Sequence, residues 1–80
     1  MSKYLLLMSE YSKDPDIPDY EHKEDFDIEK EAFKRMMQMY SDAAVNSDPE
    51  KIEHSDYGKH WATINFTNGS KTTWEILTSV

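Results

Sequence analysis

The sequence predicts an α+β fold, a small β-α-β-β domain in which one helix packs on one face of a three-stranded, mainly antiparallel sheet. Three observations predict it. An apolar run near the N-terminus has the length of a strand, and an apolar stripe at helical spacing occupies the middle of the chain. In the last third, apolar and polar residues alternate on both sides of an Asn-Gly turn. The 80 residues are expected to form one domain, residues 1–80.

The first strand is expected over residues 3–10, KYLLLMSE. Apolar residues occupy both of its faces, which is typical of a strand in the middle of a sheet. The faces consist of Tyr4, Leu6 and Met8 on one side and Leu5 and Leu7 on the other. This strand is expected to lie antiparallel to the third predicted strand, or parallel to the second through a right-handed crossover.

An acidic loop is expected next, over residues 11–25, because prolines hold it extended and its carboxylates repel one another. The stretch from Glu10 to Glu31 holds ten carboxylates and three lysines, so its net charge equals the −7 of the whole chain. The rest of the chain is neutral. The acidity is therefore a local feature, and it produces a local field.

A helix is expected over residues 27–45, with Asp25 or Asp27 as N-cap and acidic residues in the first turns, where the helix dipole favours negative charge. Two adjacent apolar stripes give it a wide face for burial. An extra helical turn is predicted over 49–53, after Asp48 and a proline. The face predicted to meet water consists of Lys34, Arg35, Gln38 and Asp42.

A C-terminal β-hairpin is expected over residues 59–78. A three-residue loop ending in a left-handed Gly69 pairs Phe66 with Ser70. This register places five apolar side chains on one face: Ala62, Ile64, Phe66, Trp74 and Ile76. Because one helix covers one face of a sheet, Trp61 and Leu77 are expected on the opposite face, where either the acidic loop covers them or they form an interface.

The residue pattern favours binding over catalysis. The chain has no cysteine and only two glycines, so it offers no thiol nucleophile and no glycine-rich phosphate loop. Its three histidines lack the i, i+4 spacing of zinc sites. We therefore expect no enzyme activity, no catalytic residue, no metal site and no cofactor. The N-terminal apolar run is too short to be a signal-peptide core or to cross a bilayer, so a cytoplasmic protein is expected, in the host cell if the source is viral.

The acidic segment is the main candidate for function. A net charge of −7 repels DNA, RNA and anionic membranes and favours basic proteins, many of which bind nucleic acid. Carboxylates displayed on a stiffened loop and a helix start can imitate a row of phosphates. The sequence therefore predicts an inhibitor that docks this surface on a basic nucleic-acid-binding protein. The residues expected to bind the partner are Asp14, Asp16, Asp19, Glu21, Glu24, Asp25, Asp27, Glu29 and Trp61.

In size and charge the chain resembles the small acidic proteins of bacterial viruses, including nucleic-acid mimics and anti-CRISPR proteins. This resemblance implies that the chain is itself an inhibitor of a partner protein, and it transfers no site residue, because it rests on no shared motif. The alternative is a structural or assembly module. In that case the uncovered sheet face around Trp61 and Leu77 forms a homodimer or docks on a larger complex, and the acidic segment only solvates the protein.

Overall fold

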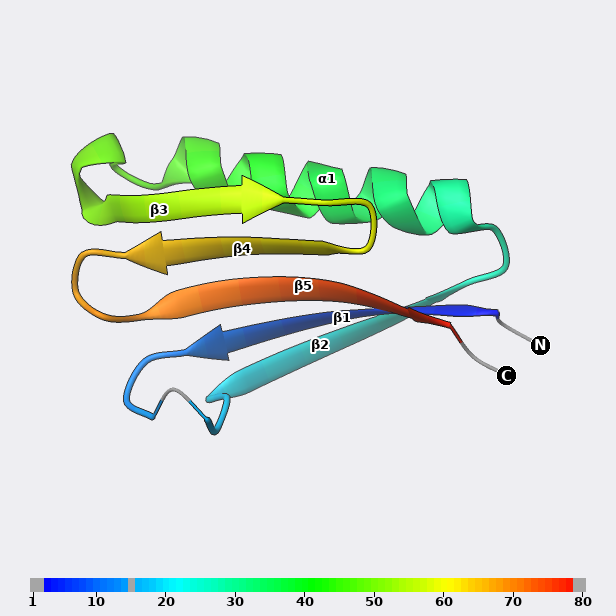
Figure 1. Cartoon of the computed structure of the whole chain (residues 1–80), viewed down its shortest axis with the longest axis horizontal. Coiled ribbons are helices and arrows are strands. Elements are labelled where there is room, and N and C mark those ends of the chain that lie inside the picture. The colour runs from blue at the N-terminus through cyan, green and yellow to red at the C-terminus, as the bar shows by residue number, and fades with distance from the viewer. Residues whose placement is uncertain (1–2, 15, 79–80) are drawn as a thin grey trace.

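The computed structural model describes residues 3–14 and 16–78. Its five strands form one antiparallel sheet in the order β2-β1-β5-β4-β3, with one long helix (Figure 1). The α+β class is confirmed, but the sheet has five strands where the sequence predicted three. In chain order the elements are β1 (Tyr4–Tyr11), β2 (Tyr20–Phe26), α1 (Glu29–Asn46), a 3-10 turn η1 (Pro49–Lys51), β3 (Ile52–Tyr57), β4 (Trp61–Phe66) and β5 (Lys71–Thr78).

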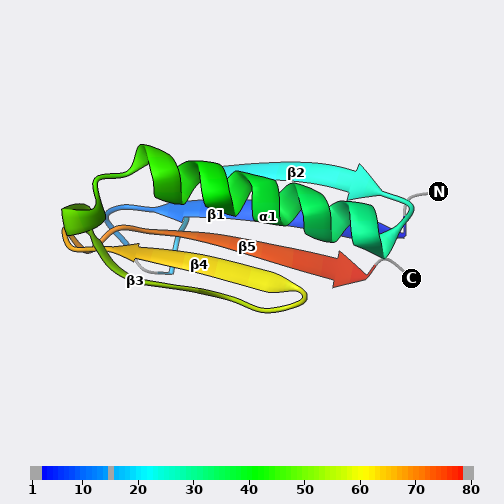
Figure 2. The same ribbon diagram turned by 90° about the horizontal axis from the view of Figure 1, so that it is seen from above.

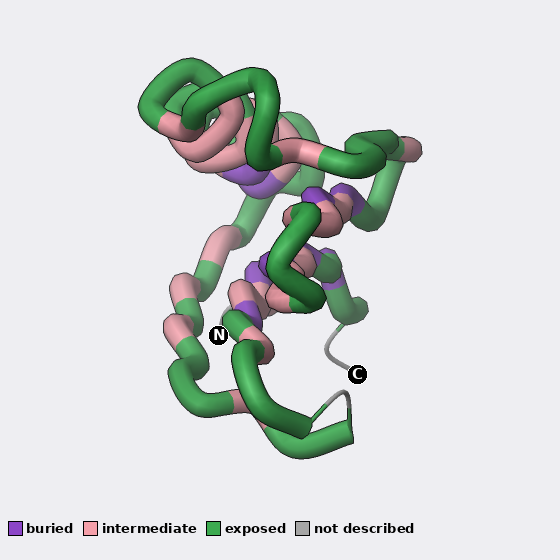
Figure 3. The backbone as a smooth tube through the Cα atoms, turned by 90° about the vertical axis from the view of Figure 1, so that its left-hand side faces the viewer, coloured by how far each residue is buried: buried purple, intermediate pink, exposed green. Residues whose placement is uncertain are grey.

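The helix α1 crosses one face of the sheet and contacts β1, β2, β4 and β5 (Figures 2 and 3). Alternate side chains of the inner strands point toward it, and they form the core with the inward side of the helix. The Trp74 and Tyr40 rings pack nearly perpendicular to each other, with 5.9 Å between their centroids. The buried core residues are Leu6, Ala32, Met36, Ala62, Ile64, Trp74 and Ile76.

The hairpin has the predicted register. Gly69 adopts φ +92°, a conformation that L side chains rarely adopt. Its N–H donates to the Phe66 carbonyl, and the Phe66 N–H donates to the Ser70 carbonyl. This three-residue loop turns the predicted five apolar side chains toward α1. β1 lies antiparallel to β5, the first of the two predicted arrangements.

Two polar segments are strands that the sequence did not indicate. The predicted loop over 11–25 is wrong in its second half, since Tyr20–Phe26 is the edge strand β2, paired antiparallel with β1. Ile52–Tyr57 is the other edge strand, β3, and its register shifts between Ile52 and His54. β1 lies between β2 and β5, so both of its edges form backbone hydrogen bonds. β2 supplies the partners for one edge, and β5 supplies those for the other.

The helix begins two residues later than predicted, at Glu29. Its N-cap is Ile28, whose side chain forms no capping hydrogen bond, so Asp25 and Asp27 are not the caps. The reason is that β2 continues through Phe26, which leaves Asp25 in the strand and Asp27 in a two-residue connection. Farther along, Asp48 caps η1 by accepting a hydrogen bond from the Glu50 N–H, close to the predicted extra turn.

In the described part of the chain, no helix combines the length and the apolar character that crossing a membrane requires.

Candidate functional site

The strand β2 divides the acidic segment between the two faces of the sheet. Because side chains of a strand alternate, Glu21 and Asp25 lie on the side away from α1, with Lys23 between them. Glu24 lies on the side of the helix, as does His22. The predicted single array of carboxylates therefore does not form, and only part of it faces outward from the sheet.

Glu24 is tied to the helix. Its Oε1 accepts a hydrogen bond from Arg35 Nε at 3.0 Å, and its Oε2 lies 2.8 Å from His22 Nε2. The Arg35 hydrogen bond lowers the pKa of Glu24, a shift that partial burial opposes. The same bond raises the pKa of Arg35. Arg35 was predicted to face water, and its side chain is 40% exposed. Its guanidinium also joins the edge strand β2 to α1 through Glu24.

The other predicted carboxylates lie at the two ends of β2. Before the strand, Asp19 accepts hydrogen bonds from the Ser12 N–H, at 2.9 Å, and from the Ser12 hydroxyl, while Asp14 accepts one from the Asp16 N–H. These bonds hold the turn between β1 and β2. After the strand, Asp27 is exposed in the connection and Glu29 Oε1 lies 2.8 Å from His60 Nε2. Of these carboxylates, Asp14 lies near Tyr11 and Lys71, with which it lines a small hollow.

The side of the sheet away from α1 is uncovered in the described chain (Figure 3). Trp61 and Leu77 lie on it, 44% and 40% exposed, as the hairpin register predicts. Leu77 pairs directly with Leu5 of β1. We call this side the open face; it consists of Leu5, Leu7, Ser9, Tyr11, Glu21, Lys23, Asp25, His54, Asp56, Trp61, Thr63, Asn65, Lys71, Thr73, Glu75 and Leu77.

Two further carboxylates of the open face were not among the predicted site residues. Glu75 of β5 lies between Leu7 and Trp61, its neighbours on the two adjacent strands. Asp56 of β3 lies beside Thr63. The predicted hairpin register already put Glu75 on the same face as Trp61, so that signal was available. Asp56 could not be found in this way, because β3 itself was not predicted.

Gly58 sets the position of the Trp61 ring. A Cβ atom on Gly58 would lie 2.3 Å from Trp61 Nε1 and 2.8 Å from Cε2, so the indole edge rests against the glycine backbone. The Gly58 N–H also donates to the Trp61 carbonyl at 2.8 Å. The absence of a side chain at Gly58 therefore allows this half-exposed ring to lie on the β3–β4 turn.

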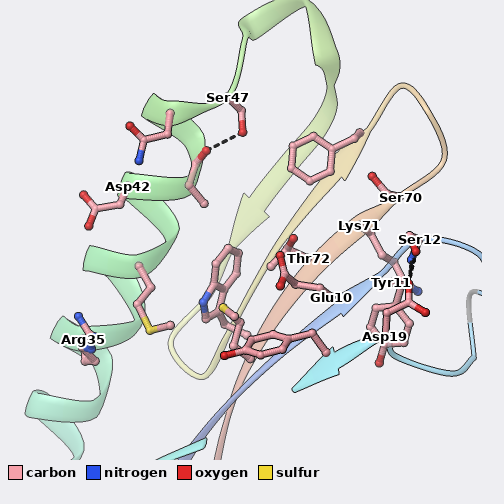
Figure 4. Close-up of a pocket in the computed structure, with 17 residues that line it drawn as sticks. Glu10, Tyr11, Ser12, Asp19, Arg35, Asp42, Ser47, Ser70, Lys71 and Thr72 are labelled. Carbon is pink, nitrogen blue, oxygen red and sulfur yellow. Dashed lines mark hydrogen bonds between the residues drawn. The ribbon is translucent and has the colours of Figure 1, made fainter. Parts of the chain in front are cut away.

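A groove of about 680 Å³ runs between the C-terminal half of α1 and the strands, on the covered side of the sheet. Figure 4 shows Arg35 and Asp42 on the helix across from Glu10 and Thr72 on the strands. The hydroxyls of Ser12 and Ser70, which also line it, donate to Asp19 and Asn68. No histidine is among the described residues that line the groove. It therefore lacks the serine–histidine pair of acyl-transfer sites.

Among residues 3–14 and 16–78, no group of three or more His, Asp or Glu side chains is arranged to hold a metal ion.

The comparisons with known proteins found no matching family model, no similar curated protein and no similar solved structure.

Proposed function

We propose that this protein is a non-catalytic inhibitor that docks its open face on a basic, nucleic-acid-binding protein. The observation that carries the proposal is the composition of that face. Exposed Trp61 lies directly opposite Glu75, and exposed Leu77 lies in the same row as Asp25, with Leu5 between them. Glu21 lies farther along the edge strand β2 on the same face. Aromatic and aliphatic side chains within a charged surround are typical of protein interfaces.

The charge of the open face supports a basic partner. The open face carries four carboxylates, Glu21, Asp25, Asp56 and Glu75, against two lysines, Lys23 and Lys71. Lys23 lies between the carboxylates of Glu21 and Asp25 on β2. We therefore propose general attraction to a basic surface, and not a match between individual carboxylates and the phosphates of a nucleic acid. Such attraction speeds association and weakens with salt.

A second copy of the chain fits this face less well. Two open faces brought together would place Glu75 of each copy inside an interface that also holds the other copy's carboxylates, and like charges at an interface are costly. We therefore expect a monomer in solution. Light scattering over a wide range of concentrations checks this, and a concentration-dependent dimer that Trp61→Asp abolishes would favour the assembly-module alternative.

The test compares the parent protein with two charge-matched variants, each immobilised and exposed to bacterial lysate. The open-face variant carries Glu21→Gln, Asp25→Asn and Glu75→Gln. The control variant removes three charges elsewhere, by Glu31→Gln, Asp42→Asn and Glu50→Gln. Asp56 is left intact because its carboxylate accepts a hydrogen bond from the Tyr57 N–H.

We expect parent and control to retain a nucleic-acid-binding protein that salt or added DNA or RNA releases, and the open-face variant to lose it. Retention of the same protein by all three, or retention that high salt does not weaken, would contradict the proposal. A circular dichroism spectrum that matches the parent establishes that each variant is folded.

A further inference from the structure

The open face has a shallow hollow of about 290 Å³ between β4 and β5. The strand register sets its walls. Trp61 lies directly opposite Glu75, and Thr63 lies directly opposite Thr73. The hollow therefore combines an aromatic ring, a carboxylate and two hydroxyl groups within two neighbouring rows of the sheet.

From this combination we infer that the hollow, which we call the Trp61–Glu75 site, binds the guanidinium group of a partner's arginine. This inference rests on the proposed function and names the chemistry that the basic partner supplies. A guanidinium stacks on an indole ring and donates two parallel hydrogen bonds to a carboxylate. The threonine hydroxyls accept the remaining N–H donors, since a hydroxyl oxygen is an acceptor.

The carboxylate of the site is free to accept such bonds. Glu75 is exposed and takes part in none of the salt bridges formed by the described residues, which join His22 and Arg35 to Glu24 and His60 to Glu29. The nearest lysine in its row, Lys23, lies two strands away, beyond Leu7. The second lysine of the face, Lys71, is placed over the Tyr11 ring, 4.7 Å from its centroid.

The aromatic wall is held in place before any partner arrives. The Trp61 indole packs against the backbone of Gly58 on the β3–β4 turn. A ring that is already positioned loses little conformational freedom on binding. Lysine fits the site less well than arginine, because an ammonium group is not planar and cannot stack on the ring while donating to a carboxylate in a forked geometry.

The test uses N-acetyl-arginine amide and ¹⁵N-labelled protein. The chain has two tryptophans, so its spectrum contains two indole N–H signals. Trp61 belongs to the site. Trp74 also borders the hollow, but its side chain is buried on the α1 side of the sheet, so its indole N–H serves as an internal control. We expect the Trp61 signal to shift in a saturable manner while the Trp74 signal does not. N-acetyl-citrulline amide, which has the same shape without the charge, is expected to produce no saturable shift.

Glu75→Gln is expected to weaken binding of the arginine probe about three- to fivefold, the upper part of the range for an exposed charge pair. Glu31→Gln removes the same charge from the exposed side of α1 and is expected to leave the affinity unchanged. An unshifted Trp61 signal, an equal response to citrulline, or equal affinity of parent and Glu75→Gln would each overturn the inference.

The arginine-probe titration and the lysate capture can fail independently of each other. If lysate capture depends on the open-face carboxylates but the arginine probe does not bind, the Trp61–Glu75 site is wrong and the docking face stands. If the probe binds as expected but no basic protein is captured, the arginine site stands and the proposed function is wrong.

Discussion

The two faces of the sheet come from the same strands but differ in what covers them. Trp74 lies on the covered face with 2% of its surface exposed, and Trp61, on the neighbouring strand, lies on the open face with 44% exposed. An odd or even position in the strand decides which face a side chain joins. One set of strands therefore has two different faces: one forms the core, and the other remains exposed.

The largest expected difference between the faces is in the free energy of unfolding of two tryptophan variants. Trp74→Ala removes a fully buried ring and is expected to cost about 3–5 kcal/mol, which is a large part of the stability of so small a chain. Trp61→Ala is expected to cost less than about 1 kcal/mol. Urea unfolding measures both. Equal costs would mean that the open face is covered in solution.

A smaller effect is expected for Gly58→Ala, which tests how the open face is organised. A methyl group at this position overlaps the Trp61 ring, so the indole must move away from the turn. We expect a loss of about 1 kcal/mol in unfolding free energy together with a changed chemical shift of the Trp61 indole N–H. The Trp74 signal should stay in place. An unchanged Trp61 signal would contradict the described contact.

The smallest expected effect concerns two glutamates of β2 that point to opposite faces. Glu24→Gln removes the ion pair with Arg35 and is expected to cost about 0.5–1 kcal/mol near neutral pH. Glu21→Gln, on the open face, is expected to change stability by less than about 0.5 kcal/mol. Urea unfolding of both variants makes the comparison, and a larger loss for Glu21→Gln would contradict the assignment of faces.

The Glu24 contribution should depend on pH in a defined direction. Its pKa in the folded protein is lower than the ordinary value of 4.5, so the unfolded chain takes up the proton first as the pH falls. The stabilisation is present in full above that ordinary pKa and is lost as the pH falls through the lowered one. The difference in stability between the parent and Glu24→Gln should therefore shrink in acid. A difference that grows below pH 4.5 would have the wrong sign.

The elements with a strong apolar pattern were predictable from the sequence. The stripe of the helix, the apolar β1 and the alternation around Gly69 each placed an element close to its observed bounds. The hairpin register also predicted that Trp61 and Leu77 point away from the helix. In these segments the local pattern and the final packing agree, which is the condition under which sequence reasoning succeeds.

The two edge strands were not predictable in this way because they bury little. In β2, five consecutive charged or polar residues separate Tyr20 from Phe26, and β3 has one half-buried residue at its start. Pairing with β1 and β4 makes them strands, and that pairing is a property of the whole fold. Because β2 was not predicted, the helix cap was assigned to Asp25 or Asp27 instead of Ile28. For the same reason one acidic surface was predicted, whereas the alternation of side chains along β2 divides the carboxylates between the two faces of the sheet.

The chain has four leucines, and they allow the two faces to be compared in one spectrum. Leu5, Leu7 and Leu77 lie on the open face, and Leu6 lies in the core beneath α1. The decisive measurement is a methyl spectrum of ¹³C-leucine-labelled protein, recorded while the basic protein recovered by capture is added. We predict that the signals of Leu5, Leu7 and Leu77 shift or broaden ahead of that of Leu6. Changes confined to Leu6, or equal changes in all four leucines, would contradict docking through the open face.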